Sequence, residues 1–463
     1  MKITARLTAL VLLLVCGSAF AAETPPNFVI VFIDDLGYGD LGCYGGESKT
    51  PVLDTASREG IRFTQFCVAA PICSPSRCGL LTGQWPQRWK ITSFLENREA
   101  NERRGMAQWL DPAAPTLARS LKALGYATGH FGKWHLGGQR NVGEAPLISE
   151  YGFDASLTNF EGLGDRVLPV MGGFDGRPEQ KLPLGLGSEK LGRGTITWAP
   201  RHEVTARFVE RSLAFIDEAR AERKPFFINI WPDDVHSPFS PPPGGAGDGS
   251  KRALYRSVLE NLDRQLGPLF ERLRSDEALF ANTLVLVAGD NGPEAGAGQT
   301  AGLRGHKGLL YEGGVREAFL VWGGLVAQDR RGTTDSETVL SALDVFPSLM
   351  RLAGSEPPAG CDGEDASQAI TGRGKWTRAK PLVWRRPPDR PKDGDEDAPD
   401  LAIREGSWKF LMEGNGSRPQ LYDLAADPAE SRNLAEEQPD RVAAMRTPLE
   451  AWAKGPGRNA ARQ

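Results

Sequence analysis

The segment Asn27-Phe28-Val29-Ile30-Val31-Phe32-Ile33-Asp34-Asp35-Leu36-Gly37-Tyr38-Gly39-Asp40 decides the predicted fold of this 463-residue chain. Its apolar run is continuous, which is typical of a strand buried on both faces of a parallel sheet. The run ends abruptly in two carboxylates and glycines. Aspartate by itself favours turns, but ligands of open α/β sheets gather at the carboxyl ends of strands. Asp34 and Asp35 therefore predict a divalent-metal site.

A second predicted strand, Thr283-Leu284-Val285-Leu286-Val287-Ala288, ends in the same way. It leads into Asp290-Asn291-Gly292, which taken alone is an ordinary turn. Together with the two acids of the first segment, this pair completes an oxygen-rich set of ligands. Such a set suits a hard cation, Ca²⁺ or Mg²⁺, rather than zinc.

A third motif, Gly132-Lys133-Trp134-His135-Leu136-Gly137, follows a predicted helix (Thr116 to Leu124) and a short strand. A solvated surface loop would explain one such motif. Only five histidines occur in the chain, however, and this one lies two residues from a lysine in a loop framed by glycines. Lys133 and His135 placed in this way are suited to binding an oxyanion and moving a proton.

The most specific motif is Cys73-Ser74-Pro75-Ser76-Arg77, which continues as Cys78-Gly79-Leu80-Leu81-Thr82-Gly83. Its spacing matches neither a disulfide nor a zinc site. A lone Cys-x-Pro-x-Arg pentapeptide occurs by chance, and an unpaired cysteine is often simply buried. With the other motifs in the same order along the chain, from residue 27 to 314, the segment resembles the signature of the type I sulfatases.

The resemblance implies a sulfuric ester hydrolase in which Cys73 is oxidised after synthesis to formylglycine. A maturation enzyme that generates formylglycine is then an implied partner. In this family one hydroxyl of the hydrated aldehyde attacks sulfur, and the other later expels the sulfate. A plain thiol would be trapped once sulfated.

The resemblance also implies the roles of the remaining site residues. His236 follows the predicted strand Phe226–Trp231, and Lys307 precedes the segment Glu312-Gly313-Gly314. Arg316-Glu317-Ala318 departs from the commoner Arg-Val-Pro of the family. The implied roles are Ca²⁺ ligands for Asp34, Asp35, Cys73, Asp290 and Asn291; sulfate binding for Arg77, Lys133 and Lys307; protonation of the leaving alcohol for His236; and a base for His135.

The substrate predicted for this enzyme is a sulfated carbohydrate, although the type of sugar, the linkage and the sulfate position stay open. The loops predicted to bind the alcohol part are Trp85 to Arg104, Gly138 to Gly194 and Asp233 to Gly249. Trp85 and Trp89 suit a sugar or simply pack the first loop. Two alternatives remain: a homologue that is unmodified or non-catalytic and binds sulfated glycans, and a phosphoester hydrolase of the same superfamily.

The predicted fold class is α/β, with a large, mostly parallel sheet flanked by helices, as in alkaline phosphatases and sulfatases. The catalytic domain is expected over residues 22–354, followed by a linker to residue 374. Residues 375–463 are expected to form a smaller antiparallel α+β subdomain. The remaining helices are predicted at His202 to Ala221, Arg252 to Leu273, Val339 to Leu352 and Pro439 to Ala453.

Residues 1–21 have the pattern of a secretory signal peptide, with a basic start, an apolar run and small residues at the end. The run is too short for a transmembrane anchor, so a periplasmic or secreted protein is predicted. Removing this segment takes away Lys2 and Arg6 and moves the formal net charge from −4 to about −6. An acidic chain gives no support to nucleic-acid binding. No pairing is predicted for Cys43, Cys67, Cys78 and Cys361.

Overall fold

Strand β1 (Asn27–Ile33) lies in the interior of the main sheet, as its apolar run predicts. The computed structural model describes residues 25–173, 177–181, 188–389 and 398–456. All of β1 is buried, and successive side chains point to opposite faces of the sheet. The hydrophobic core on one face contains Phe28, Ile30 and Phe32, and the core on the other face contains Val29, Val31 and Ile33. A strand enclosed on both faces needs apolar residues at every position, which explains the continuous run.

Across the described residues the main sheet has nine strands. Their order is β11 (Thr333–Asp335), β2 (Ile61–Cys67), β10 (Arg316–Gly323), β9 (Thr283–Gly289), β1, β8 (Phe226–Trp231), β3 (Ala127–Gly132) and β4 (Ala155–Leu157), with β12 (Leu340–Ser341) paired to β2. All pairs are parallel except those of β10, which is antiparallel to β9 and β2. The predicted mostly parallel sheet is confirmed. The carboxyl ends of β9, β1, β8 and β3 consequently lie side by side at one edge.

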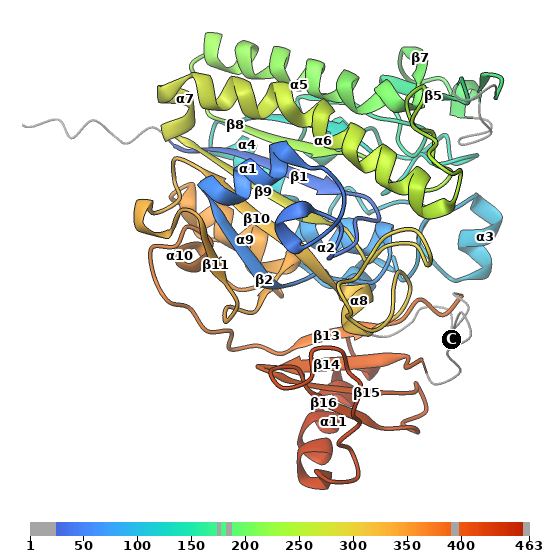
Figure 1. Ribbon diagram of the computed structural model, residues 1–463, viewed down its shortest axis with the longest axis vertical. Helices are drawn as coiled ribbons and strands as arrows, with labels where there is room; N and C mark the ends of the chain where they lie inside the picture. Colours follow the sequence, from blue (N-terminus) through green and yellow to red (C-terminus); the bar gives the residue numbers. More distant parts are fainter. Residues whose placement is uncertain (1–24, 174–176, 182–187, 390–397, 457–463) are drawn as a thin grey trace, which may run out of the picture.

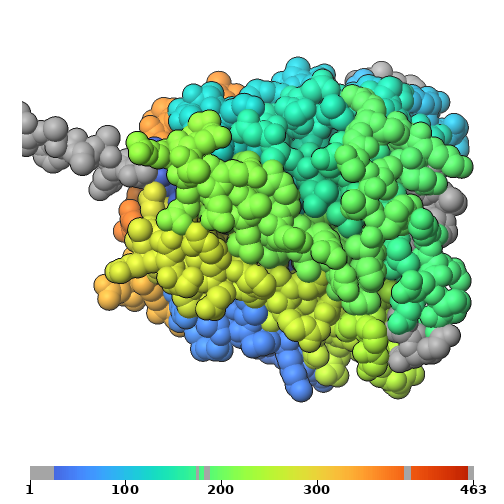
Figure 2. Space-filling view, turned by 90° about the horizontal axis from the view of Figure 1, so that it is seen from above, coloured from blue at the N-terminus to red at the C-terminus, as the bar shows by residue number. Residues whose placement is uncertain are grey.

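Helices cover both faces of this sheet (Figure 1). One face carries α1 (Pro51–Glu59), α5 (Val204–Ala221), α6 (Lys251–Ser275) and α7 (Glu277–Ala281). Viewed from above, α5 in green and α6 in yellow-green cover much of the surface on this side (Figure 2). The opposite face carries α2 (Cys73–Thr82), α4 (Leu117–Ala123) and α9 (Ala342–Leu352). Three further short helices are α3 (Arg98–Arg103), α8 (Glu312–Val315) and α10 (Ser367–Ile370).

A smaller antiparallel sheet lies below the main sheet in Figure 1, in orange and red. It consists of β13 (Leu382–Arg385), β14 (Leu401–Glu405), β15 (Trp408–Met412) and β16 (Gln420–Asp423), in that order. Helix α11 (Pro439–Lys454) packs on it through Met445, Leu449 and Trp452. The predicted C-terminal antiparallel α+β arrangement is confirmed.

Two segments have more structure than the sequence predicts. The stretch 138–194, expected to be loop, contributes β5 (Arg166–Met171) and β6 (Gln180–Lys181), which form a separate sheet with β7 (Ile196–Pro200). These strands are short and are separated by segments that contain several glycines, so no periodicity indicates them. The stretch 354–374, expected to be a linker, contains α10, which packs beside α9.

The predicted signal peptide, residues 1–21, lies outside the described residues. Within the part of the chain that the structure describes, no helix combines the length and the hydrophobicity needed to cross a bilayer. The cysteines in this part, Cys43, Cys67, Cys73, Cys78 and Cys361, are all free thiols.

A buried ion cluster joins the smaller sheet to the main one. The Lys409 Nζ atom lies 2.8 Å from a Glu312 carboxylate oxygen and 3.0 Å from one of Glu430, and all three side chains are buried. Burial alone would lower the pKa of Lys409, but the two carboxylates outweigh it and raise that pKa. The Trp384 indole also donates a hydrogen bond of 2.8 Å to the Val68 carbonyl of the main part.

We predict that Lys409→Met lowers the free energy of unfolding by about 3–5 kcal/mol, because the buried carboxyl groups of Glu312 and Glu430 would both lose their contact with this cation. Urea denaturation followed by tryptophan fluorescence measures the change. Lys454→Met on α11, where the lysine side chain is 78% exposed, is the control and should change stability by less than about 0.5 kcal/mol. Equal stability of the two variants would contradict a role for the cluster in holding the sheets together.

Candidate active site

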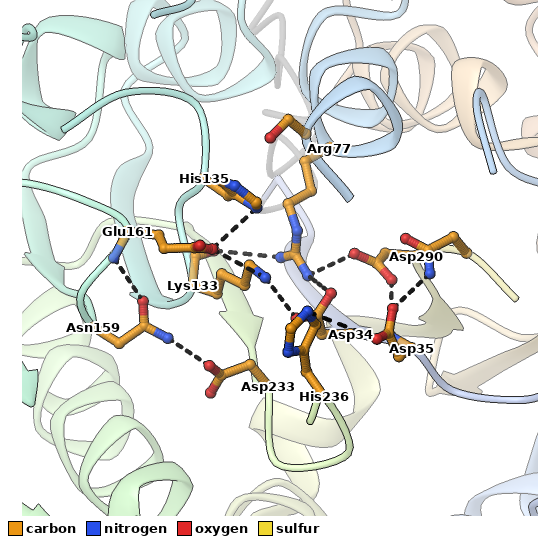
Figure 3. Close-up of polar contacts among 12 residues, drawn as sticks. Asp34, Asp35, Arg77, Lys133, His135, Asn159, Glu161, Asp233, His236 and Asp290 are labelled. Carbon is orange, nitrogen blue, oxygen red and sulfur yellow. Dashed lines mark hydrogen bonds and ion pairs between the residues drawn. The ribbon is translucent and has the colours of Figure 1, made fainter. Parts of the chain in front are cut away.

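The residues predicted from separate motifs meet at the carboxyl edge of the main sheet (Figure 3). Four adjacent strands, β9, β1, β8 and β3, each end in one of the motifs. Arg77 comes from α2, and Lys307 from the loop between β9 and α8. The following contacts connect all ten predicted site residues: Asp34, Asp35, Cys73, Arg77, Lys133, His135, His236, Asp290, Asn291 and Lys307.

Three carboxylates form the centre of the site. One carboxylate oxygen each of Asp34, Asp35 and Asp290 lies within 4.8 Å of the other two, and the three residues are buried. The Asp35 backbone N–H donates to Asp290 Oδ1 at 3.0 Å, and Asn291 Nδ2 donates to Asp35 Oδ1 at 2.7 Å. The Asn291 Oδ1 atom is buried without a hydrogen bond. This donor set is made of oxygen atoms and fits a divalent metal ion.

The backbone supports this cluster at a cost in conformational energy. Asp35 has a φ of 56° and His135 a φ of 54°, in the left-handed region that non-glycine residues rarely adopt. Both residues stand directly in the loops that follow core strands. Such conformations persist where the surrounding structure fixes them, and they cluster at functional sites.

The pKa values of Asp34 and Asp290 are shifted in opposite directions, because the carboxylates are crowded together. Burial, and next the negative charge of Asp34, raise the pKa of Asp290 well above its usual range. Burial would also raise the pKa of Asp34, but Lys133 and Arg77 outweigh it and hold that pKa well below the usual value. The cluster therefore carries negative charge that cations must balance.

Cys73 is the first residue of α2, and its side chain is buried beside the carboxylates. Its Sγ atom lies within 4.8 Å of ligand atoms of Asp34 and His236. The rest of the motif shapes the helix: Ser74 accepts a hydrogen bond from the Leu95 N–H, and Gly83 ends the helix with a φ of 65°. Burial, and next the charge of Asp34, raise the pKa of the Cys73 thiol well above its usual value. An unmodified Cys73 in this state is a poor nucleophile.

Three cations face the acids. An Arg77 terminal nitrogen lies 2.7 Å from an Asp290 oxygen and 3.1 Å from an Asp34 oxygen. The Lys133 Nζ atom lies 2.8 Å from Asp34, and the Lys307 Nζ atom lies 2.7 Å from Asp35. Arg77 also packs on the rings of Phe32 and Trp231, and is fully buried. These cations can hold an anionic group next to Cys73.

The two predicted site histidines differ in exposure. The His236 side chain is 27% exposed, and its Nε2 lies 3.8 Å from Asp35. The His135 ring is buried, with Nε2 2.8 Å from the Leu95 carbonyl oxygen. His130 is separate from both: it packs among Trp134, Phe153 and Trp231, and burial lowers its pKa to about 3.

The structure adds a polar chain that sequence reasoning missed. Glu161 lies 3.0 Å from both Lys133 Nζ and His135 Nδ1. Asn159, Asp233 and Arg201 continue from it in a buried series of hydrogen bonds. Glu161 lies within a segment predicted only as a substrate loop, and no local motif marks it. Its position depends on how β4 and β5 place the intervening loop.

Part of the first predicted substrate loop, residues 85–104, lies next to the site at His135. The Phe94 ring lies 6.4 Å from the His135 ring, and the Arg104 guanidinium carbon lies 4.5 Å from the Phe94 ring centre. Trp85 instead packs on Trp452 of α11. Trp89 likewise packs against the main core. For these two tryptophans the packing alternative agrees with the structure.

Comparisons with known proteins identify the family of the chain. A sulfatase family model matches residues 26–355. The chain is 33% identical to human arylsulfatase A, over 91% of this chain and 86% of that protein. It is 29% identical to an N-acetylgalactosamine-6-O-sulfatase of Bacteroides thetaiotaomicron, over 92% and 93% of the two chains. The solved structure of Ps i-CgsB with k-i-k-neocarrahexaose has a TM-score of 0.75 and 22% identity, covering 94% of both chains.

The fold and the site together define a hydrolase that acts on an anionic ester. The chain belongs to the sulfatase family. Its reaction is therefore the hydrolysis of sulfate esters. The resemblance to sulfatases, which the sequence motifs indicate, is confirmed.

We predict that a divalent cation raises the thermal unfolding midpoint of chelator-treated protein, because an ion that binds only the folded state stabilises it. At a hundred times its dissociation constant the gain is about 2.7 kcal/mol. Asp290→Asn should reduce the rise measured by scanning calorimetry with Ca²⁺ or Mg²⁺. Asp217→Asn on α5, where the side chain is 65% exposed, should retain it. An undiminished rise in Asp290→Asn would contradict a cation site at this cluster.

Proposed function

We propose that this sulfatase removes sulfate from a sulfated carbohydrate, with a formylglycine formed from Cys73 as nucleophile and one bound Ca²⁺. The observation that carries the proposal is the position of Cys73. It is the first residue of a buried helix, within 4.8 Å of Asp34 and His236, and surrounded by cations that suit a sulfate group. The formylglycine-generating enzyme is then a required partner.

Residues Asp34, Asp35, Asp290 and Asn291 would hold the Ca²⁺, and the modified Cys73 would lie beside it. The fit rests on the all-oxygen donor set and on the buried Asn291 Oδ1, which has no hydrogen bond. When bound, the ion would balance the carboxylates and draw charge from the sulfate oxygens. A hydrated aldehyde at Cys73 would supply two hydroxyls on one carbon, one to attack sulfur and one to expel the sulfate.

The protein's own side chains bind the sulfate and move protons. Arg77, Lys133 and Lys307 hold the sulfate oxygens and stabilise the charge that builds up at the transition state. His236 is the proposed acid for the leaving alcohol, because it is the partly exposed histidine of the site and lies next to Cys73. A sugar alkoxide is a poor leaving group, so this proton transfer contributes to the rate. His135 is the residue predicted to act as base on the second hydroxyl.

The relatives favour a carbohydrate substrate. An N-acetylgalactosamine-6-O-sulfatase matches nearly the full chain, and Ps i-CgsB was solved with a bound neocarrahexaose. A phosphoester hydrolase is the less favoured alternative, because Cys73 and its helix carry the sulfatase signature. A non-catalytic glycan-binding protein is also less favoured, because every expected charged residue is present. The pattern of residues 1–21 supports export to the periplasm or the medium.

We predict that mass spectrometry of the peptide spanning Cys73, from protein made in its natural host, detects a mass loss matching thiol-to-aldehyde conversion. Cys73→Ala should lower sulfate release at least about a thousandfold, the scale seen when other covalent enzymes lose their nucleophile. Cys78→Ala, five residues further along α2, is the matched control and should retain turnover. Ion chromatography of free sulfate, released from a panel of sulfated oligosaccharides, measures the rate.

Parent-like turnover of pure Cys73→Ala would reject the nucleophile. An unmodified Cys73 in inactive protein would favour the glycan-binding alternative, and faster hydrolysis of phosphate than of sulfate esters would favour the phosphoesterase.

A further inference from the structure

The Glu161 carboxylate contacts two of the proposed catalytic residues at once. Its Oε2 atom lies 3.0 Å from Lys133 Nζ and 3.0 Å from His135 Nδ1 (Figure 3). The Glu161 carbonyl oxygen also accepts a 2.7 Å hydrogen bond from the His135 backbone N–H. The loop after β3 is thus held by both the backbone and the side chain of one residue.

The charges around Glu161 keep it ionised. Its side chain is only 8% exposed, so burial alone would raise its pKa. His135 and Lys133, followed by His236, outweigh burial and hold the pKa of Glu161 well below its usual range. A buried carboxylate of this kind interacts strongly with the neighbouring cations, because the surrounding medium has a low polarity.

The surroundings of His135 determine which protons its ring carries. Nε2 faces the Leu95 carbonyl, and Nδ1 faces the Glu161 carboxylate. Both partners are hydrogen-bond acceptors, and a neutral ring carries one proton, so it can donate to only one of them at a time. Burial lowers the pKa of His135, and Glu161 opposes that effect, while Lys133 adds to it. Burial prevails and the pKa of His135 lies below its usual value, so the ring is neutral at neutral pH and keeps a lone pair on one nitrogen, as the base role predicted for it requires.

Glu161 is itself fixed by a chain of buried polar groups. The Glu161 N–H donates to Asn159 Oδ1 at 3.2 Å, and Asn159 Nδ2 donates to Asp233 Oδ2 at 2.8 Å. The Asp233 carbonyl accepts a hydrogen bond from the His236 backbone N–H at 3.1 Å. Arg201 holds the other Asp233 oxygen at 2.8 Å. One continuous network thus connects the loop of His135 with the loop of His236.

We propose that Glu161 is a positioning residue for sulfate ester hydrolysis: its carboxylate holds Lys133 and His135 in one fixed arrangement at the sulfate-binding end of the site. The inference deepens the proposed function, because it uses the roles proposed for Lys133 and His135. The chemistry of a carboxylate that orients a histidine and stabilises its charged form is well established in other hydrolases. Here the same carboxylate also fixes a lysine.

The test compares Glu161→Gln, Glu161→Asp and Glu210→Gln. Glutamine keeps the size and removes the charge, aspartate keeps the charge on a shorter side chain, and Glu210 on α5 is a control whose side chain is 73% exposed. The substrate is 4-nitrophenyl sulfate, and conversion of Cys73 is checked by mass spectrometry in each preparation. The expected result for Glu161→Gln is a loss of kcat of at least about tenfold, because a misplaced group weakens transition-state binding. Glu161→Asp should recover part of this loss, and the control should match the parent.

A second measurement does not depend on turnover. The chain has only five histidines, so their ring nitrogens can be followed by NMR in ¹⁵N-histidine-labelled protein. Loss of one signal in His135→Gln assigns His135. In Glu161→Gln the midpoint of its titration should move to lower pH by at least about one unit, because an opposite charge nearby favours the protonated ring. Glu161→Asp should stay closer to the parent.

Parent-like kcat and a parent-like His135 titration in folded Glu161→Gln would overturn the proposal. If Glu161→Gln does not fold, parent-like kcat in Glu161→Asp would overturn it in the same way, because a side chain one carbon shorter would not hold both Lys133 and His135. Inactivity of the parent with fully converted Cys73, both on 4-nitrophenyl sulfate and on the panel of sulfated oligosaccharides, would instead reject the proposed sulfate ester chemistry. In that case the NMR titration still decides whether Glu161 holds the ring.

Discussion

The contact of Arg77 with Asp34 and Asp290 is the interaction on which the site depends. Three carboxylates buried at one edge of a sheet repel each other, and desolvation adds to the cost of their charge. Arg77 touches two of them, lies fully inside the protein and packs on Phe32 and Trp231. Because Arg77 stands on the helix that begins with Cys73, the same contact fixes the cysteine against the acids.

The remaining charges extend this balance outward. Lys133 and Lys307 each approach one carboxylate, and Glu161 balances Lys133 from the other side. The result is a site with alternating charges, in which each ion has an oppositely charged neighbour. Its cations keep their charge at neutral pH and remain available to an anionic group. Glu317 on β10 is a further buried acid near Asp290. Burial raises the pKa of Glu317 well above its usual value, so this carboxyl group is protonated and adds no negative charge.

The C-terminal part takes part in this arrangement through the segment after Lys307. Glu312 belongs to α8, and its carboxylate pairs with Lys409 of β15. The small sheet therefore fixes one end of the loop that carries Lys307. This connection explains why a sheet at the bottom of the molecule bears on a site formed by the main sheet (Figure 1).

How far the sequence predicts this structure depends on whether the signal is local. The strands β1, β8 and β9 are marked by apolar runs, and the helices α5, α6, α9 and α11 were expected within a few residues of their observed bounds. The motif residues also come together as expected, since parallel strands end at one edge. The strands β5 to β7 were not expected, because their short segments have no periodicity. Glu161 was missed for a related reason: it lies 28 residues after Lys133 with no motif around it, and only the path of the chain joins them.

The sequence by itself determined the fold class, the acids and cations of the site and the cysteine signature, because a pattern of a few adjacent residues indicates each of them. Tertiary structure alone decided which charges pair, which histidine is exposed and where Glu161 stands. Pairing of charges depends on distances of about 3 Å between segments far apart in the chain, and on a low-polarity interior that makes such distances matter. No pattern of neighbouring residues carries that information.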